Sequence, residues 1–209
     1  MRHFTSLAIV TTLAVGAASC GDVARSGRSP VFLVIDSLGA LAGGADDTQA
    51  TSFLSSDVQR MDTKPAPCSE TSPCATTYGD AGEAVFHLSL RDIGAVGSVT
   101  EPSSNNQVTL TRYRVTYRRS DGRNTQGVDV PYAFDGAATV TVPASGTAKL
   151  GFELVRNVAK MEAPLVQLVS NYTIITTIAD VTFYGQDLVG NEIQATGSIQ
   201  VNFGNFADR

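Results

Sequence analysis

Histidine is scarce in this sequence, which has only two in 209 residues, His3 and His87. Because His3 precedes the apolar N-terminal segment, a Ser-His-Asp triad, a histidine general base or a histidine-rich metal site would have to use His87. His87 alternates with apolar residues, which places its side chain on the outer face of a strand. Gly-x-Ser-x-Gly and Gly-x-x-x-x-Gly-Lys motifs are also absent. We therefore expect no catalytic residue, no metal and no cofactor.

Charged residues are sparse as well, at 17% of the chain, whereas Gly, Thr, Val and Ser are plentiful. This balance is typical of an all-β extracellular protein rather than a helical one. Acidic residues outnumber basic ones by 20 to 15, which gives a formal net charge of −5. Nucleic-acid binding depends on Lys and Arg that neutralise phosphates, so we expect no nucleic-acid partner.

The chain has no apolar run long enough to cross a membrane, since about 20 residues are needed. Its longest apolar stretch covers residues 4–15 and contains Thr and Ser. A short basic segment, Met1–His3, precedes this stretch, and small residues follow it as far as Ser19. Basic, apolar and small residues in this order are the pattern of an export signal. We expect residues 1–19 to be a signal peptide.

Cys20 directly follows these small residues and resembles the lipobox cysteine of bacterial lipoproteins. In that family the thiol receives a diacylglycerol and the chain is cut just before it, which implies lipidation of Cys20 and a membrane partner. Gly21, rather than Asp, favours the outer membrane by the sorting pattern of the family. Ala17 stands where the family usually has Leu, and Ala17-x-Ser19 also suits an ordinary signal peptidase. A secreted, soluble protein is therefore the alternative location.

Three cysteines are an odd number for an exported protein. If Cys20 is acylated, Cys68 and Cys74 remain as a pair in a Pro-rich stretch. We expect a disulfide between them, within a surface loop over residues 62–82. A metal site is the competing interpretation, but two cysteines without a nearby histidine supply too few ligands. Residues 20–29 are small and polar and indicate a flexible tether, and residues 30–207 then form a single domain.

Alternation of apolar and polar residues predicts strands along most of this domain. Residues 38–41 could prolong the first strand or begin a helical turn, and residues 163–169 could hold a helical turn or a buried crossover. Pro143–Gly146 indicates a hairpin turn between its two flanking strands. The apolar parity changes within residues 107–119, which predicts a bulge near Thr111–Arg112. The expected strands cover residues 31–35, 52–59, 84–93, 107–119, 137–142, 147–155, 172–186 and 193–203.

The last two of these segments predict a long hairpin around Asp187–Asn191, where Gly190 can take a positive φ. Such a hairpin, with a central strand like Tyr113–Tyr117, resembles bacterial immunoglobulin-like and fibronectin type III-like modules. The resemblance implies an immunoglobulin-like antiparallel β-sandwich of about seven to nine strands. The chain lacks the core Trp and the strand-borne cysteine pair of antibody domains.

Arg112, Arg114 and Arg118 share one face of their predicted strand. They could form an arginine stripe that binds an anionic glycan or lipid headgroup, or a solvated outer face whose cations pack on the sheet. Asp180 could be a buried acid by its parity, or an exposed one at a bulge or edge.

From these features we expect a non-enzymatic envelope lipoprotein that acts as a structural or binding module at the cell surface, with an envelope protein or a glycan as its partner. The alternative is an accessory subunit that positions a larger secretion, transport or envelope complex. A glycan-active enzyme is a distant third, because the glutamates are scattered singly and only the fold could pair two carboxylates.

Overall fold

The computed structural model describes residues 28–45, 49–92 and 101–206. The expected signal peptide, Cys20 and residues 21–27 of the expected tether lie outside the described residues. Within those residues ten strands and three short helices follow one another. They are β1 (Val31–Leu41), β2 (Phe53–Asp57), β3 (Arg60–Asp62), β4 (Cys74–Thr76), β5 (Asp80–Leu90), η1 (Ser104–Asn106), β6 (Val108–Arg118), β7 (Phe134–Val142), β8 (Ala148–Val155), α2 (Asn157–Lys160), η2 (Leu165–Val169), β9 (Ile175–Asp187) and β10 (Glu192–Gly204).

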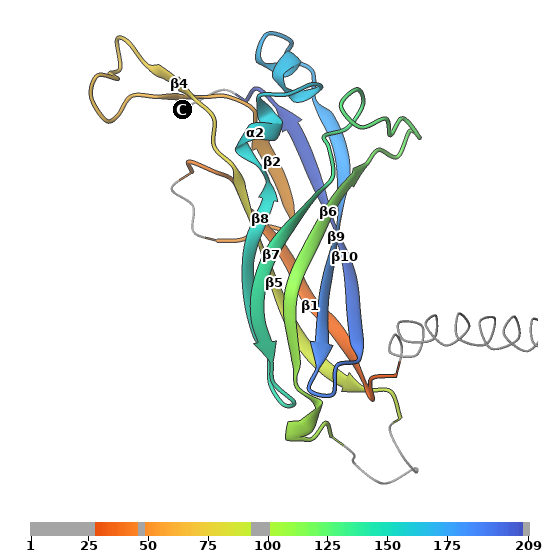
Figure 1. Cartoon of the computed structure of the whole chain (residues 1–209). Coiled ribbons are helices and arrows are strands. Elements are labelled where there is room, and N and C mark those ends of the chain that lie inside the picture. The colour runs from red at the N-terminus through yellow and green to blue at the C-terminus, as the bar shows by residue number, and fades with distance from the viewer. Residues whose placement is uncertain (1–27, 46–48, 93–100, 207–209) are drawn as a thin grey trace, which may run out of the picture.

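The strands form three sheets, in the orders β1-β5-β8, β2-β10-β9-β6-β7 and β3-β4. The first two sheets curve around a shared core (Figure 1). Aromatic rings cross between them: Phe86 of β5 meets Phe183 of β9 at a centroid distance of 4.8 Å, and Phe152 of β8 meets Tyr113 of β6 at 5.2 Å. Such ring pairs add about 0.5–1.5 kcal/mol each to the area they bury. The mostly β expectation is confirmed.

The period-two pattern explains which side chains enter this core. Along β9, alternate residues from Thr177 to Asp187 are buried, and those between them are exposed or half-buried. Because successive strand residues point to opposite faces, this alternation lets one face of the sheet cover the core. Fully buried side chains such as Val181 and Phe183 of β9 stabilise the fold by about 1.5–3 kcal/mol each.

The predicted bulge in β6 is confirmed. Both neighbours of β6 shift register between Leu110 and Arg112. The extra residue, Thr111, is exposed, and this lets Leu110 and Tyr113 both face the core although their spacing is odd.

The terminal hairpin is also confirmed, because β9 and β10 pair antiparallel from Gln186↔Glu192 to Ile175↔Phe203. Gly190 takes a φ of 84° in the turn. The Asp187 carboxylate accepts hydrogen bonds from Val189 N at 3.1 Å, Asn191 N at 2.8 Å and Asn191 Nδ2 at 2.8 Å. An aspartate that binds the amides of its own turn is a standard turn device.

The hairpin expected around Pro143–Gly146 is wrong. β7 pairs with β6, whereas β8 pairs with β5, so residues 143–147 cross from one sheet to the other. Turn residues reverse the chain equally well in both cases. Here β7 and β8 lie next to each other, but each pairs with a strand of its own sheet instead of with the other.

Of the two alternatives for residues 38–41, the structure shows the longer strand, because β1 runs through to Leu41 past a bulge between Ile35 and Ser37. The first half of the domain departs from expectation in two further ways. β2, predicted as a strand within residues 52–59, pairs parallel to the end of β10, so the sheet is not wholly antiparallel. The segment 62–82 is not one loop, because β3 and β4 pair as a two-stranded ribbon and β5 begins at Asp80.

The expected disulfide is confirmed, with Cys68 and Cys74 bonded at the tip of this ribbon. Tyr78 at the ribbon's base donates a hydrogen bond to Asp62 at 2.6 Å, which lowers the pKa of Asp62 and raises the pKa of Tyr78. The same ring packs on Gly44, where an added Cβ would lie 2.6 Å from the Tyr78 ring and the φ is 70°. The ribbon is thus fixed to the two larger sheets although it projects from them (Figure 1).

The domain has two distinct ends (Figure 1). At the first, which we call the entry end, the chain enters β1 and the turns 143–147 and 188–191 lie together with η1. The opposite end, which we call the far end, carries the β3–β4 ribbon, the β6–β7 loop and the segment with α2 and η2.

Candidate functional site

The site begins at the seam where β1 lies beside β10. In the described residues no ladder joins these two strands, because β1 pairs with β5 and β10 pairs with β9 and β2. Side chains close the middle of the seam. A Cβ added at Gly197 would lie 3.1 Å from Leu38 and 3.2 Å from Ile35, so the glycine lets β1 approach closely.

Toward the entry end the seam opens into a groove of about 510 Å³. Its floor is apolar, because Val31, Leu33 and Ile193 of the core reach it. Its walls are polar and aromatic. The groove is lined by Val31, Phe32, Leu33, Arg91, Thr111, Arg112, Tyr184, Gly185, Gln186, Glu192, Ile193 and Gln194.

Two arginines of the groove are stacked on aromatic rings. The Cζ of Arg91 lies 4.4 Å from the ring centroid of Phe32, and the Cζ of Arg112 lies 3.9 Å from that of Tyr184. The ring attracts the cation through its face and holds the planar guanidinium flat, so the N–H donors in its plane remain directed outward. Phe32 is 48% exposed, which keeps the Arg91 pair open to solvent.

Asp135 of β7 fixes one of these arginines further. Arg112 Nη1 donates to Asp135 Oδ1 at 2.7 Å, and Arg114 Nη1 donates to Asp135 Oδ2 at 2.8 Å. Arg112 is therefore held by a ring and a carboxylate at once. Planar donors preset in this way suit a carboxylate, phosphate or sulfate group.

The three arginines of the expected stripe are not equivalent. Only Arg112 lines the groove. Arg114 donates to Asp135, and Arg118 donates from Nε to Asp180 Oδ2 at 2.7 Å, a hydrogen bond that raises the pKa of Arg118. Asp180 is half-buried on the outer face and also accepts a bond from Ser198 at 2.5 Å. Sequence reasoning found Arg112 but missed Arg91, Phe32 and Tyr184.

The groove offers little for glycoside hydrolysis. Among the described residues that line it, Glu192 alone carries a carboxylate. Glycosidases of the usual kind place two carboxylates on either side of the scissile bond.

A second polar cluster is buried near the far end. Lys160 of α2 and Asp80 of β5 form an ion pair at 2.9 Å, and both side chains are 1% exposed. Asp80 also accepts from Ser56 Oγ at 2.6 Å and from Gly43 N at 2.8 Å, and Lys160 also donates to the Asp57 carbonyl at 2.8 Å. The Asp80 carboxylate and the Lys160 ammonium are thus both hydrogen-bonded to groups beyond each other. The pair connects β5 and α2 to β2, which is a structural role.

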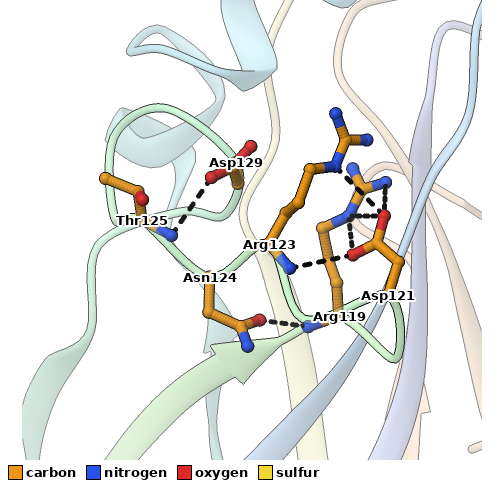
Figure 2. A network of polar contacts seen from close by, with 6 residues as sticks. All are labelled: Arg119, Asp121, Arg123, Asn124, Thr125 and Asp129. Carbon is orange, nitrogen blue, oxygen red and sulfur yellow. Dashed lines mark hydrogen bonds and ion pairs between the residues drawn. The ribbon is translucent and has the colours of Figure 1, made fainter.

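The third cluster stiffens the β6–β7 loop at the far end (Figure 2). Arg119 donates to Asp121 at 2.6 Å and Arg123 donates to it at 3.2 Å, which lowers the pKa of Asp121. Asn124 accepts from Arg119 N, and Asp129 accepts from Thr125 N. These charges satisfy one another inside the loop, so the network is a structural brace.

His87 lies on the outer face of β5, with Nδ1 2.5 Å from Asp36 Oδ1. In the part of the chain that the structure describes, no three His, Cys, Asp or Glu side chains gather as a metal site would require. No helix in that part combines the length and the apolar character needed to cross a bilayer.

Comparisons of the chain with models of protein families, with curated proteins and with solved structures found no match.

Proposed function

We propose that the chain is an envelope lipoprotein whose immunoglobulin-like sandwich binds an anionic glycan in the groove between β1 and β10. In this proposal acylated Cys20 holds the domain at the outer membrane, and residues 20–29 act as the tether. The observation that carries the binding role is the pair of ring-stacked guanidiniums, Arg91 and Arg112, in one groove.

The strand order supports the immunoglobulin-like part of the proposal. In immunoglobulin domains the first, second and fifth strands of the sandwich share one sheet, and the third, sixth and seventh share the other. Here β1, β5 and β8 correspond to the first set, and β6, β9 and β10 to the second. β7 would be the additional strand that variable-type domains add beside the third.

The chemistry of the walls favours an anionic glycan over a flat protein surface. Two fixed guanidiniums can each take a carboxylate, sulfate or phosphate group in plane. Gln186, Gln194 and Glu192 add side chains that can hydrogen-bond sugar hydroxyls. Because the groove opens to the surface at the entry end of the seam, a segment of a glycan chain can lie in it without entering the core.

Binding by purified protein to oligosaccharides of equal length tests the proposal. The set carries carboxylates, sulfates, phosphates or no charge, and isothermal titration calorimetry measures the affinity. We expect the anionic oligosaccharides to bind. Arg91→Gln should lower their affinity about tenfold, which corresponds to the loss of one charge-assisted hydrogen bond. Arg118→Gln is the matched control, since Arg118 lies outside the groove and pairs with Asp180, which no groove residue contacts through an ion pair. Equal binding of neutral sugars, or no effect of Arg91→Gln, would contradict the groove assignment.

The accessory-subunit alternative rests on the far end. Large apolar side chains are exposed there around α2 and η2, with Met161 at 56%, Tyr172 at 83% and Ile174 at 59%. Exposed apolar residues that gather on one surface favour a protein partner. Photo-cross-linking from Tyr172 in intact cells would reveal such a partner, and a Tyr172 probe that captures nothing beyond solvent would argue against this role.

A further inference from the structure

The tip of the β9–β10 turn presents two adjacent apolar side chains to solvent. Leu188 is 60% exposed and Val189 is 80% exposed. Their transfer from water to an apolar phase would be favourable, because the hydrophobic effect is roughly proportional to the apolar area removed from water.

The turn holds these side chains in place. Asp187 binds the amides of Val189 and Asn191, and Gly190 supplies the positive φ. Burial alone would raise the pKa of Asp187, but hydrogen bonds from Asn191, Ser29 and Val189 outweigh it and keep the carboxylate ionised. Little conformational entropy would therefore be lost when the tip enters another phase.

The turn is also fixed to the place where the chain enters the domain. Ser29 is 1% exposed and hydrogen-bonds to Asp187, and Arg91 N donates to the Pro30 carbonyl at 2.9 Å. Seven residues lie between Cys20 and Arg28 in the sequence, and the eight steps from one to the other span at most about 30 Å when fully extended. A lipid on Cys20 would keep the tip within that distance of the bilayer.

The other described turns at the entry end are different. The crossover at residues 143–147 is Pro-Ala-Ser-Gly-Thr, and η1 with its N-cap is Ser-Ser-Asn-Asn. Neither exposes a large apolar side chain. Among the described turns of this end, the β9–β10 turn is therefore the one that exposes large apolar side chains, in addition to Phe32 of β1, which is covered on one face by Arg91.

We infer that Leu188 and Val189 insert into the interfacial region of the membrane to which Cys20 is anchored, an inference that rests on the proposed lipid anchor. Two aliphatic side chains bind a bilayer too weakly to recruit a free protein. On a tethered domain the contact is intramolecular, and its high effective concentration makes weak insertion sufficient. The contact orients the domain, because the lining residues Gln186 and Glu192 flank the turn and bring the groove close to the membrane surface.

Fluorescence of the full acylated protein in vesicles of phosphatidylethanolamine and phosphatidylglycerol tests the inference. Val189→Cys carries an environment-sensitive NBD label, and acylated Cys20 and the Cys68–Cys74 disulfide leave the introduced thiol as the one to react. Val128→Cys is the matched control, since Val128 is 67% exposed in the β6–β7 loop at the far end. We expect label emission to rise about twofold and shift to the blue at 189 but not at 128, because only an apolar environment produces this change.

Each outcome is decisive. Leu188→Ser should reduce the emission change at 189, and Leu188→Ile should restore it. If the protein floats with the vesicles and the label at 189 stays in water, the insertion is wrong and the anchor stands. If the protein does not float, the anchor fails and the insertion fails with it. A shift at both positions would show adsorption without orientation and would overturn the inference.

Discussion

At the scale of single residues, the burial of an ion pair decides how much the domain loses in stability when one partner is removed. Lys160–Asp80 and Lys149–Glu83 have similar lengths, 2.9 and 2.6 Å. The first pair is 1% exposed at both side chains, whereas Lys149 is 64% exposed. Water screens the Lys149–Glu83 pair, so that pair contributes little to stability. If Lys160 were removed, the charge of Asp80 would stay buried without a partner, which is strongly destabilising.

We therefore predict that Lys160→Met destabilises the domain by about 3–5 kcal/mol. The same change at Lys149 should alter the free energy of unfolding by at most about 1 kcal/mol. Urea melts of both variants at pH 7 make the comparison. Equal losses would mean that Asp80 stays solvated or finds another partner after the change.

At the scale of elements, the terminal hairpin shows why parts of the fold followed from the sequence. Alternation in residues 172–203 and the Asp187–Asn191 turn are local features, so the hairpin could be predicted from them. The parity change in β6 was local too, and the bulge followed. The crossover at residues 143–147 could not be distinguished from a hairpin, because turn residues do not record which sheet the next strand joins.

A substitution at Phe203 measures how much the terminal hairpin contributes to the stability of the core. Phe203 is fully buried in β10 and contacts Tyr117 of β6, two strands away in the same sheet, at a centroid distance of 5.7 Å, so Phe203→Ala should cost about 3–5 kcal/mol. Phe53 on the adjacent strand β2 is 50% exposed, and Phe53→Ala should cost clearly less. Thermal and urea unfolding compare the two. Similar losses would show that β10 does not contribute the central core.

At the scale of the whole molecule, the candidate groove depends on long-range register. Phe32 lies in β1, Tyr184 in β9, and Arg91 directly after β5, and they line one groove because β1 lies beside β10 at the seam. Nothing local in the sequence marks these residues, since Phe32 and Tyr184 hold ordinary outward positions of their strands and Arg91 begins a loop. Arg112 could be predicted because the spacing of the arginines on β6 places them on one face. The sequence could not distinguish it from Arg114 and Arg118, because only the folded structure stacks Arg112 on Tyr184 in the groove.

The position of the groove in the whole molecule can be related to the expected location of the protein at a membrane. The groove, the β9–β10 turn and the point where residue 28 leads into β1 all lie at the entry end, opposite the ribbon and the braced β6–β7 loop. A lipid on Cys20 would place the groove toward the membrane and the far end away from it.

We predict that Cys20→Ser abolishes labelling by a fatty-acid probe and moves the protein from the membrane fraction to the soluble fraction. The apolar tip should not retain the variant, because two aliphatic side chains bind a bilayer only weakly. Residue 20 precedes the described domain, so the unfolding temperature of the purified variant should equal that of the parent with its lipid removed. Metabolic labelling and fractionation measure the first two effects. If the unlabelled variant stayed with the membrane, the attachment would belong to the domain surface, and the tether would have no part in it.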